Sequence, residues 1–279
     1  MENKNTNIGL KESNVIIAGE KTESASIKEI SKIFGGELPQ DGNIYYQEIS
    51  ENCLALISSV DVFIGNRVIG IGLNEKVTDS LIKEIKNFYK QNNKNKFFIQ
   101  ASPVENNTNI RDLILQNGGE LRSNWAKLVK IPESKKINNS EISIRELHEQ
   151  DHEYVASLLL RSFSFPEELR PFCIYAFGKP GWTNFVVMLD DKIAGTGSLY
   201  IRNGIAEIGI AATVEDARGK GVQSALIHYR ENAAFEKTCR YLFVETAEPT
   251  ANYSAPSYRN MIRLGFTELY RTPNYLFTL

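Results

Sequence analysis

The sequence lacks paired cysteines, long apolar runs and an excess of charge of one sign. Its three cysteines, Cys53, Cys173 and Cys239, are far apart and odd in number, which argues against a disulfide framework or a zinc knot and fits a reducing compartment. No apolar run approaches a membrane span, and the polar stretch 1–13 lacks the apolar core of a signal peptide. The formal net charge of −2 gives no pull toward nucleic acid or a membrane surface. We therefore expect a cytoplasmic protein that binds neither nucleic acid nor a membrane.

Metal-ligand and nucleophile motifs are also scarce. Of the three histidines, His228 stands alone, and only His148 and His152 could share one helix face. This pair flanks Asp151 at the start of a predicted helix, where solvent exposure is the ordinary outcome, so we expect no metal site. The sequence contains neither a G-x-S-x-G nucleophile turn nor a phosphate-loop lysine motif.

The length of 279 residues is enough for two domains that each bury a core. A polar and charged stretch at 131–141 contains a proline and is the best candidate for a linker. We therefore expect one domain over residues 1–135 and a second over residues 141–279.

The second half predicts an α/β domain with a mixed sheet. Two acidic residues, Asp190 and Asp191, separate two apolar runs and indicate a β-hairpin. The runs at 206–214 and 241–246 should form parallel strands, because a helical pattern lies between them. The predicted strands cover 142–145, 186–189, 193–201, 206–214 and 241–246, and the predicted helices cover 151–163, 166–177 and 222–233.

The end of the chain predicts one more helix and the strands that close the sheet. We expect this helix to be capped by Ser254, to carry Pro256 in its first turn and to stop at Gly265. Strands follow from Phe266, and a turn at 272–274 is expected to divide them.

The most informative stretch is the loop RGKGVQ at 218–223, which lies between a predicted strand and a predicted helix. The first turn of a helix carries unpaired N–H groups and a partial positive charge, so an anion is stabilised there. Glycines let the backbone approach such a ligand closely. In the strand before the loop, Gly209 predicts a bulge. The loop is therefore a candidate phosphate site; a plain strand-to-helix turn with solvated charges is the alternative.

The stretch ARGKGVQSAL resembles the acetyl-CoA pyrophosphate loop of the GNAT superfamily of N-acetyltransferases, with Arg218 and Gly221 at matching positions and Gln223 in place of a small residue. The stretch SYRNMIRLGF is similar to the family's last helix and its Gly-Phe end. Met261 stands where family members often carry a tyrosine. The resemblance covers residues 141–279 and implies acetyl-CoA as co-substrate. The residues it implies for binding acetyl-CoA are Ala212, Thr213, Val214, Arg218, Gly219, Lys220, Gly221, Val222, Gln223, Ser224, Ser257 and Asn260.

Acetyl transfer to an amine also needs a general base and a general acid. Glu207 is the first candidate for the base, because it shares a strand face with Gly209; Glu245 and a water chain are alternatives. Tyr258 is the candidate acid, one helical turn from the family position. Tyr253, Tyr270 and Tyr275 are the other tyrosines nearby, and any of these side chains could instead have a structural role. We expect an aromatic segment to contribute either to acceptor recognition or to the core: Phe163, Phe165, Pro166, Phe172 and Trp182.

The first half repeats the second in weaker form. Predicted strands at 67–73 and 96–101 and predicted helices at 77–89 and 108–116 correspond to elements about 140 to 147 residues later. The loop between the first strand and helix is Asn-Glu-Lys, without glycine. We therefore expect tandem GNAT-like domains, the first a degenerate copy with a structural or substrate-shaping role. An unrelated α/β domain is the alternative.

Taken together, the residues and the resemblance predict an N-acetyltransferase that transfers the acetyl group of acetyl-CoA to a primary amine of a small molecule or peptide, by direct attack in a ternary complex. A homodimer is compatible with this interpretation. The alternative is an acyl-CoA-binding sensor or interaction module without catalysis. A dinucleotide-binding interpretation of GKGVQS fails, because a hairpin precedes the motif and too few strands follow it.

Overall fold

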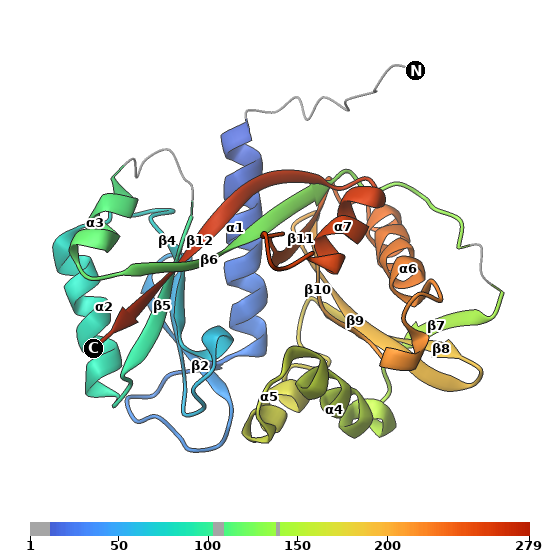
Figure 1. The fold of residues 1–279 in the computed structure, drawn as a ribbon, viewed down its shortest axis with the longest axis horizontal. Coiled ribbons are helices and arrows are strands. Elements are labelled where there is room, and N and C mark those ends of the chain that lie inside the picture. Colours follow the sequence, from blue (N-terminus) through green and yellow to red (C-terminus); the bar gives the residue numbers. More distant parts are fainter. Residues whose placement is uncertain (1–11, 103–108, 138–139) are drawn as a thin grey trace.

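The computed structural model describes residues 12–102, 109–137 and 140–279. Within these residues, twelve strands form one continuous mixed sheet in the order β1-β2-β3-β4-β5-β12-β6-β11-β10-β9-β8-β7 (Figure 1). The predicted α/β fold with a mixed sheet is confirmed. The strands are β1 (Lys32–Ile33), β2 (Ile44–Ser50), β3 (Cys53–Ser58), β4 (Arg67–Ile71), β5 (Lys96–Ala101), β6 (Glu120–Lys130), β7 (Ile142–Glu146), β8 (Trp182–Leu189), β9 (Lys192–Arg202), β10 (Ile205–Thr213), β11 (Tyr241–Ala247) and β12 (Thr267–Thr278).

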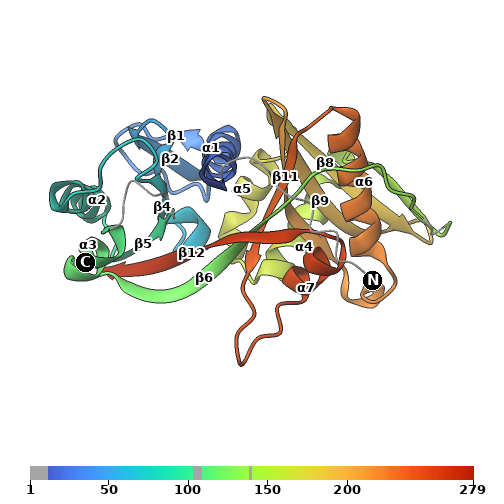
Figure 2. The ribbon, with the colours of Figure 1, turned by 90° about the horizontal axis from the view of Figure 1, so that it is seen from above.

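Helices cover both faces of this sheet. Helix α1 packs against both β4 and β10 and therefore lies between the two halves, as Figure 2 shows from above. Helix α6 packs on β9 and β10 from the opposite face, since successive residues of β10 alternate between α6 and α1. The α-helices are α1 (Glu12–Ile30), α2 (Asp79–Gln91), α3 (Ile110–Gln116), α4 (His152–Phe163), α5 (Arg170–Tyr175), α6 (Val222–Glu236) and α7 (Pro256–Arg263), and the 3₁₀ turns are η1 (Phe63–Gly65), η3 (Glu149–Asp151), η4 (Glu167–Leu169) and η5 (Glu215–Ala217).

The two halves repeat one arrangement. In each, two parallel strands are joined by a helix: β4 and β5 by α2, and β10 and β11 by α6. Position 108, where the helix matching α3 was predicted to begin, lies outside the described residues.

The last strand of each half is placed in the sheet of the other half. Strand β6 pairs with β11, β12 pairs with β5, and β6 and β12 pair with each other in the middle (Figure 2). Side chains follow the same exchange, because Phe277 of β12 stacks on Phe97 of β5 with ring centroids 4.9 Å apart. The two halves of the chain therefore share one sheet.

Several local predictions are confirmed. Asp190 and Asp191 connect β8 to β9 with positive φ angles of 51° and 57°, as a two-residue type I′ turn requires. Gly265 ends α7 with a φ of 88°. Strands β10 and β11 are parallel.

Two predictions at the end of the chain are wrong. The N-cap of α7 is Ala255, in a left-handed conformation, rather than Ser254; Pro256 is in the first turn as predicted. Residues 272–274 form no turn, because β12 continues through them as one strand that pairs with β6 along its length. From Asn274 onward the same strand also pairs with β5, and this long-range pairing keeps it extended.

Cys53, Cys173 and Cys239 are free and buried. No helix in the described ranges has the length and apolarity needed to cross a bilayer. Within the same ranges, no group of histidine, cysteine or carboxylate side chains is arranged to hold a metal ion.

Candidate active site

The glycine loop ends at an open helix start. Gly219 and Gly221 have φ angles of 76° and 84°, which favour glycine, and Gly221 is the N-cap of α6. A glycine cap has no side chain to accept from the first N–H groups of the helix. These donors, together with the partial positive charge of the helix start, remain available to an anion.

A cavity of about 930 Å³ lies against this helix start, between α6, α7 and the end of β10. Arg263 and Thr196, which sequence reasoning missed, also line it. Val214 packs against the core and Lys220 is exposed, and neither lines the cavity. The predicted coenzyme residues that line it are Ala212, Thr213, Arg218, Gly219, Gly221, Val222, Gln223, Ser224, Ser257 and Asn260.

Side chains tie α6 to α7 along this cavity. Asn260 donates a hydrogen bond to Gln223, so the residue that departs from the family pattern is held by α7. Arg263 donates to Ser224 Oγ at 2.9 Å and to Asn260 Oδ1 at 3.1 Å. These contacts fix the distance between the two helices.

Strand β10 has the predicted bulge and then separates from β11. It pairs with β11 only over Ile205–Ile208, and its register with β9 shifts between Gly209 and Ala212. Ile210, inside the bulge, has a φ of 47°. Ala211, inside the bulge, and Ala212, directly after it, line the cavity with small side chains. The main chain of β10 is therefore free of its parallel neighbour where the cavity reaches the sheet.

Two carboxyl groups lie beside this separation, on the face covered by α1. Glu207 accepts from Ser26 Oγ of α1 at 3.2 Å, and burial together with the nearby Glu23 raises its pKa to about 7. Glu245 accepts from Gln100 Nε2 at 3.0 Å, and burial followed by Glu23 raises its pKa to about 7 as well. Both groups can gain or lose a proton near neutral pH.

Lys127 of β6 forms ion pairs with two of the carboxylates in this region, Glu23 and Glu245. Its side chain is 1% exposed, and Nζ lies 2.6 Å from Glu23 and 3.3 Å from Glu245. Burial alone would lower the pKa of Lys127, but Glu23 and then Glu245 hold it well above its usual value. The first half of the chain therefore supplies, through α1 and β6, the charges that surround the carboxyl groups of β10 and β11.

The comparison with family models matches residues 143–266 to the acetyltransferase (GNAT) family. This segment is a GNAT acetyltransferase domain. No curated protein matches the sequence.

Solved structures share the fold over most of the chain. A GCN5-related N-acetyltransferase from Kribbella flavida has a TM-score of 0.62 at 12% identity, over 92% of this chain and 94% of that one. One from Sphaerobacter thermophilus has a TM-score of 0.56 at 14% identity, over 81% and 80%. A tandem GNAT protein from the clavulanic acid biosynthesis pathway has a TM-score of 0.57 at 12% identity, over 96% and 97%. These solved GNAT structures therefore share their fold with both halves of this chain.

Of the four tyrosines considered as acids from the sequence, Tyr253 alone lines the cavity. Tyr258 donates a hydrogen bond to Glu268 at 2.6 Å, which raises the pKa of the phenol, and it does not line the cavity. Tyr270 is buried and donates to Glu20, and Tyr275 lies in the core of the first half. Tyr253 lines the cavity and is half exposed. Met261, at the family's tyrosine position, is buried in the core.

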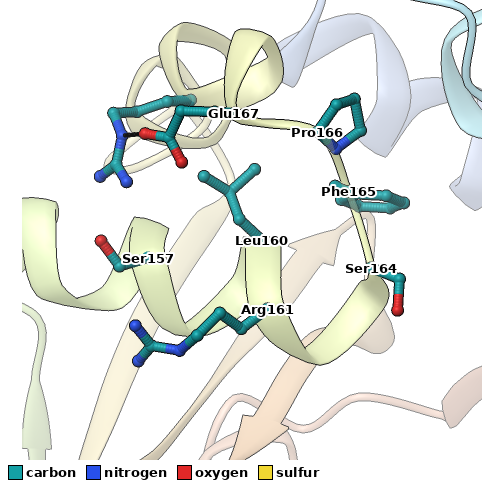
Figure 3. Close-up of a pocket in the computed structure, with 8 residues that line it drawn as sticks. Ser157, Leu160, Arg161, Ser164, Phe165, Pro166 and Glu167 are labelled. Atoms are coloured by element: carbon teal, nitrogen blue, oxygen red, sulfur yellow. Dashed lines mark hydrogen bonds and ion pairs between the residues drawn. The ribbon is translucent and has the colours of Figure 1, made fainter.

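The aromatic segment assigned to acceptor recognition divides between cavity and core. Phe163 lines the coenzyme-sized cavity, whereas Phe172 and Trp182 are core residues. Phe165 and Pro166 line a second depression of about 440 Å³ at the C-terminal end of α4 (Figure 3). Its other lining residues are Ser157, Leu160, Arg161, Ser164, Glu167 and Arg170.

Proposed function

We propose that this protein transfers the acetyl group of acetyl-CoA to a primary amine of a small molecule or peptide within a ternary complex. One observation carries the proposal: a single cavity extends from an open, cationic helix start to the point where β10 leaves β11. Acetyl-CoA fits this polarity, because its extended pantetheine arm separates the anionic diphosphate from the acyl group.

The coenzyme residues have separate tasks in this proposal. The diphosphate lies against the N–H groups after Gly221, where Arg218 adds a cationic donor. Ser257 and Asn260 of α7 contact the arm, which passes the small side chains of Ala211 and Ala212. The thioester then reaches the bulge of β10, whose main-chain N–H groups donate hydrogen bonds to the developing oxyanion.

Glu207 is the proposed general base. The amine attacks the thioester carbon, a C–N bond forms and the C–S bond breaks. Glu207 lies on the α1 face of β10 and does not line the cavity, so the ammonium proton passes to its carboxylate through water. The pKa of about 7 suits a base at neutral pH. Glu245 has the same pKa but forms an ion pair with Lys127 and accepts from Gln100, so it is better suited to tuning Glu207 than to replacing it.

Tyr253 takes the place of Tyr258 as the proposed acid. Its side chain lines the cavity, whereas the Tyr258 hydroxyl is held by Glu268. The leaving thiolate of coenzyme A takes the phenolic proton, which solvent then restores. The first half has a tuning role in this scheme, through Glu23 and Lys127.

A screen of primary amines with acetyl-CoA tests the proposal. Free thiol release and mass spectrometry of the acceptor should both report turnover that depends on the amine, and Arg218→Glu should reduce it. Tight binding without thiol release from any amine would instead support the non-catalytic binding module, which Met261 and the engaged Tyr258 favour. Absence of acetyl-CoA binding would contradict both functions.

A further inference from the structure

Arg230 of α6 is a buried cation that donates its hydrogen bonds to main-chain oxygens. Its side chain is 1% exposed. Nε donates to the Leu226 carbonyl at 3.2 Å, and Nη1 donates to the carbonyls of Ser198 at 3.0 Å and Gly209 at 3.4 Å. Among the described residues, no carboxylate forms an ion pair with it, and the adjacent Glu231 pairs with Lys130 at 2.7 Å instead.

Burying an unpaired charge is expensive, so this arginine calls for an explanation. Burial lowers the pKa of the guanidinium to about 9, which expresses how poorly the site solvates the cation. An apolar side chain would fill the same space without this penalty. The contacts of Arg230 therefore point to a role other than packing.

The two carbonyls that Arg230 joins mark the bulge of β10. Ser198 and Gly209 are register partners, and they form the last regular pair of β9 and β10 before the register shifts. The sheet also makes room for the guanidinium, because a Cβ on Gly197 would lie 2.9 Å from Nη1. Arg230 thus contacts the fixed end of the segment whose N–H groups are assigned to the thioester.

We propose that Arg230 is a positioning residue for acyl transfer: it holds the β10 bulge in its open form and places a fixed positive charge beneath the thioester carbonyl. This inference rests on the proposed function. A charge in a site that excludes water stabilises a developing oxyanion without any reorganisation during the reaction. Arg230 gives up no proton; the C–N and C–S bond changes are those described above.

The binary complex with acetyl-CoA gives a direct readout, because it needs no acceptor. With ¹³C-labelled acetyl-CoA, the carbonyl stretch of the bound thioester should lie below that of the free coenzyme in the wild-type protein. In Arg230→Met it should return toward the free value, with the calorimetric affinity within about threefold of wild type. Arg230→Lys keeps the charge and should restore part of the shift.

Steady-state kinetics should follow the same order. Arg230→Met should reduce kcat by about tenfold or more, since loss of one oxyanion-stabilising group commonly reduces kcat by more than this. KM for acetyl-CoA should change little, and Arg230→Lys should recover part of kcat. Lys130→Met is the matched control: it removes another buried cation, on the strand that pairs with β11, and should lower the melting temperature while leaving kcat unchanged.

Two outcomes would overturn the inference. In the first, Arg230→Met lowers only the melting temperature, with carbonyl frequency and kcat as in the wild type. If Arg230→Met does not fold, Gly197→Ala replaces it, because its methyl group displaces the guanidinium. The second outcome is a carbonyl frequency and a kcat in Gly197→Ala that both equal those of the wild type. If the wild-type protein binds no acetyl-CoA, that result would contradict the proposed function itself.

Discussion

The loop between β10 and α6 and the corresponding loop between β4 and α2 have the same topology and opposite chemistry. At the start of α6, Gly221 leaves the N–H groups to the cavity. At the start of α2, the Thr78 hydroxyl accepts from the Leu81 N–H at 3.3 Å, and Asp79 stands in the first turn. Between β4 and α2, the Glu75 carboxylate accepts from the Gly72 N–H at 2.8 Å.

This comparison separates what a fold repeats from what a binding site needs. Both halves keep parallel strands, a connecting helix and glycines with positive φ angles near the end of the first strand or in the loop. In the first half, the chain's own side chains occupy the donors that an anion would use. We therefore infer that this scaffold offers a diphosphate site only in the half whose helix start is left open.

The largest expected effect is the loss of stability when the buried ion pairs between the two halves are removed. Lys127→Met should lower the free energy of unfolding by about 3–5 kcal/mol, because in the described part of the chain it leaves Glu245 buried without an ion-pair partner and Glu23 with only Arg67, at 3.9 Å. Urea unfolding measures this change. Lys28→Met removes an exposed pair with Glu48 and should cost less than about 1 kcal/mol. Equal effects of the two substitutions would show that the buried ion pairs of Lys127 do not stabilise the contact between the two halves.

The next effect tests the open loop. Arg218→Glu should weaken acetyl-CoA binding by about 30- to 100-fold, since a lost charge-assisted hydrogen bond is worth about 2–3 kcal/mol and the new carboxylate repels the diphosphate. Isothermal titration calorimetry measures the affinity. Lys220→Glu is the matched control, because Lys220 does not line the cavity and should have a smaller effect. An affinity unchanged by Arg218→Glu would count against the loop assignment.

The pH dependence of turnover tests Glu207. A base acts when deprotonated, so kcat/KM should rise with pH through about 7, the pKa of Glu207, and level off above it. Glu207→Gln should reduce turnover and remove this rise. Glu245→Gln should keep the rise and displace its midpoint, because Lys127 interacts with both Glu245 and Glu207. A Glu207→Gln profile identical to that of the wild type would show that another group is the base.

The smallest effect is expected in the first half. Glu75→Gln keeps the shape of the side chain and removes its charge, so stability should fall by about 1 kcal/mol with the weaker hydrogen bond to Gly72. Acetyl-CoA affinity should not change. A tighter affinity or a second binding event in this variant would mean that the first loop also binds coenzyme.

Local signals in the sequence predicted the site better than the assembly of the sheet. The glycine loop, the Asp190–Asp191 turn and the Gly209 bulge depend on neighbouring residues and appear where predicted. The single strand β12 does not, because its extended form depends on β5, about 170 residues earlier in the chain. The same exchange means that a chain cut before residue 141 would lack β6, the neighbour of β11.

The proposed catalytic side chains show the same limit. Glu207 was proposed from the two-residue strand period, but its charged neighbours come from α1 and β6 and leave no local pattern. Tyr258 has a plausible position in the sequence, and only the contact with Glu268 shows that its hydroxyl is engaged elsewhere. Arg230 looks like an ordinary helix residue until its carbonyl partners on β9 and β10 are known.

The stoichiometry of acetyl-CoA binding tests the contrast between the two loops most directly. Calorimetric titration of the full chain should give one equivalent of acetyl-CoA per chain, with the affinity lowered by Arg218→Glu and unaffected by Glu75→Gln. Two equivalents, or one whose affinity falls with Glu75→Gln and not with Arg218→Glu, would contradict the account.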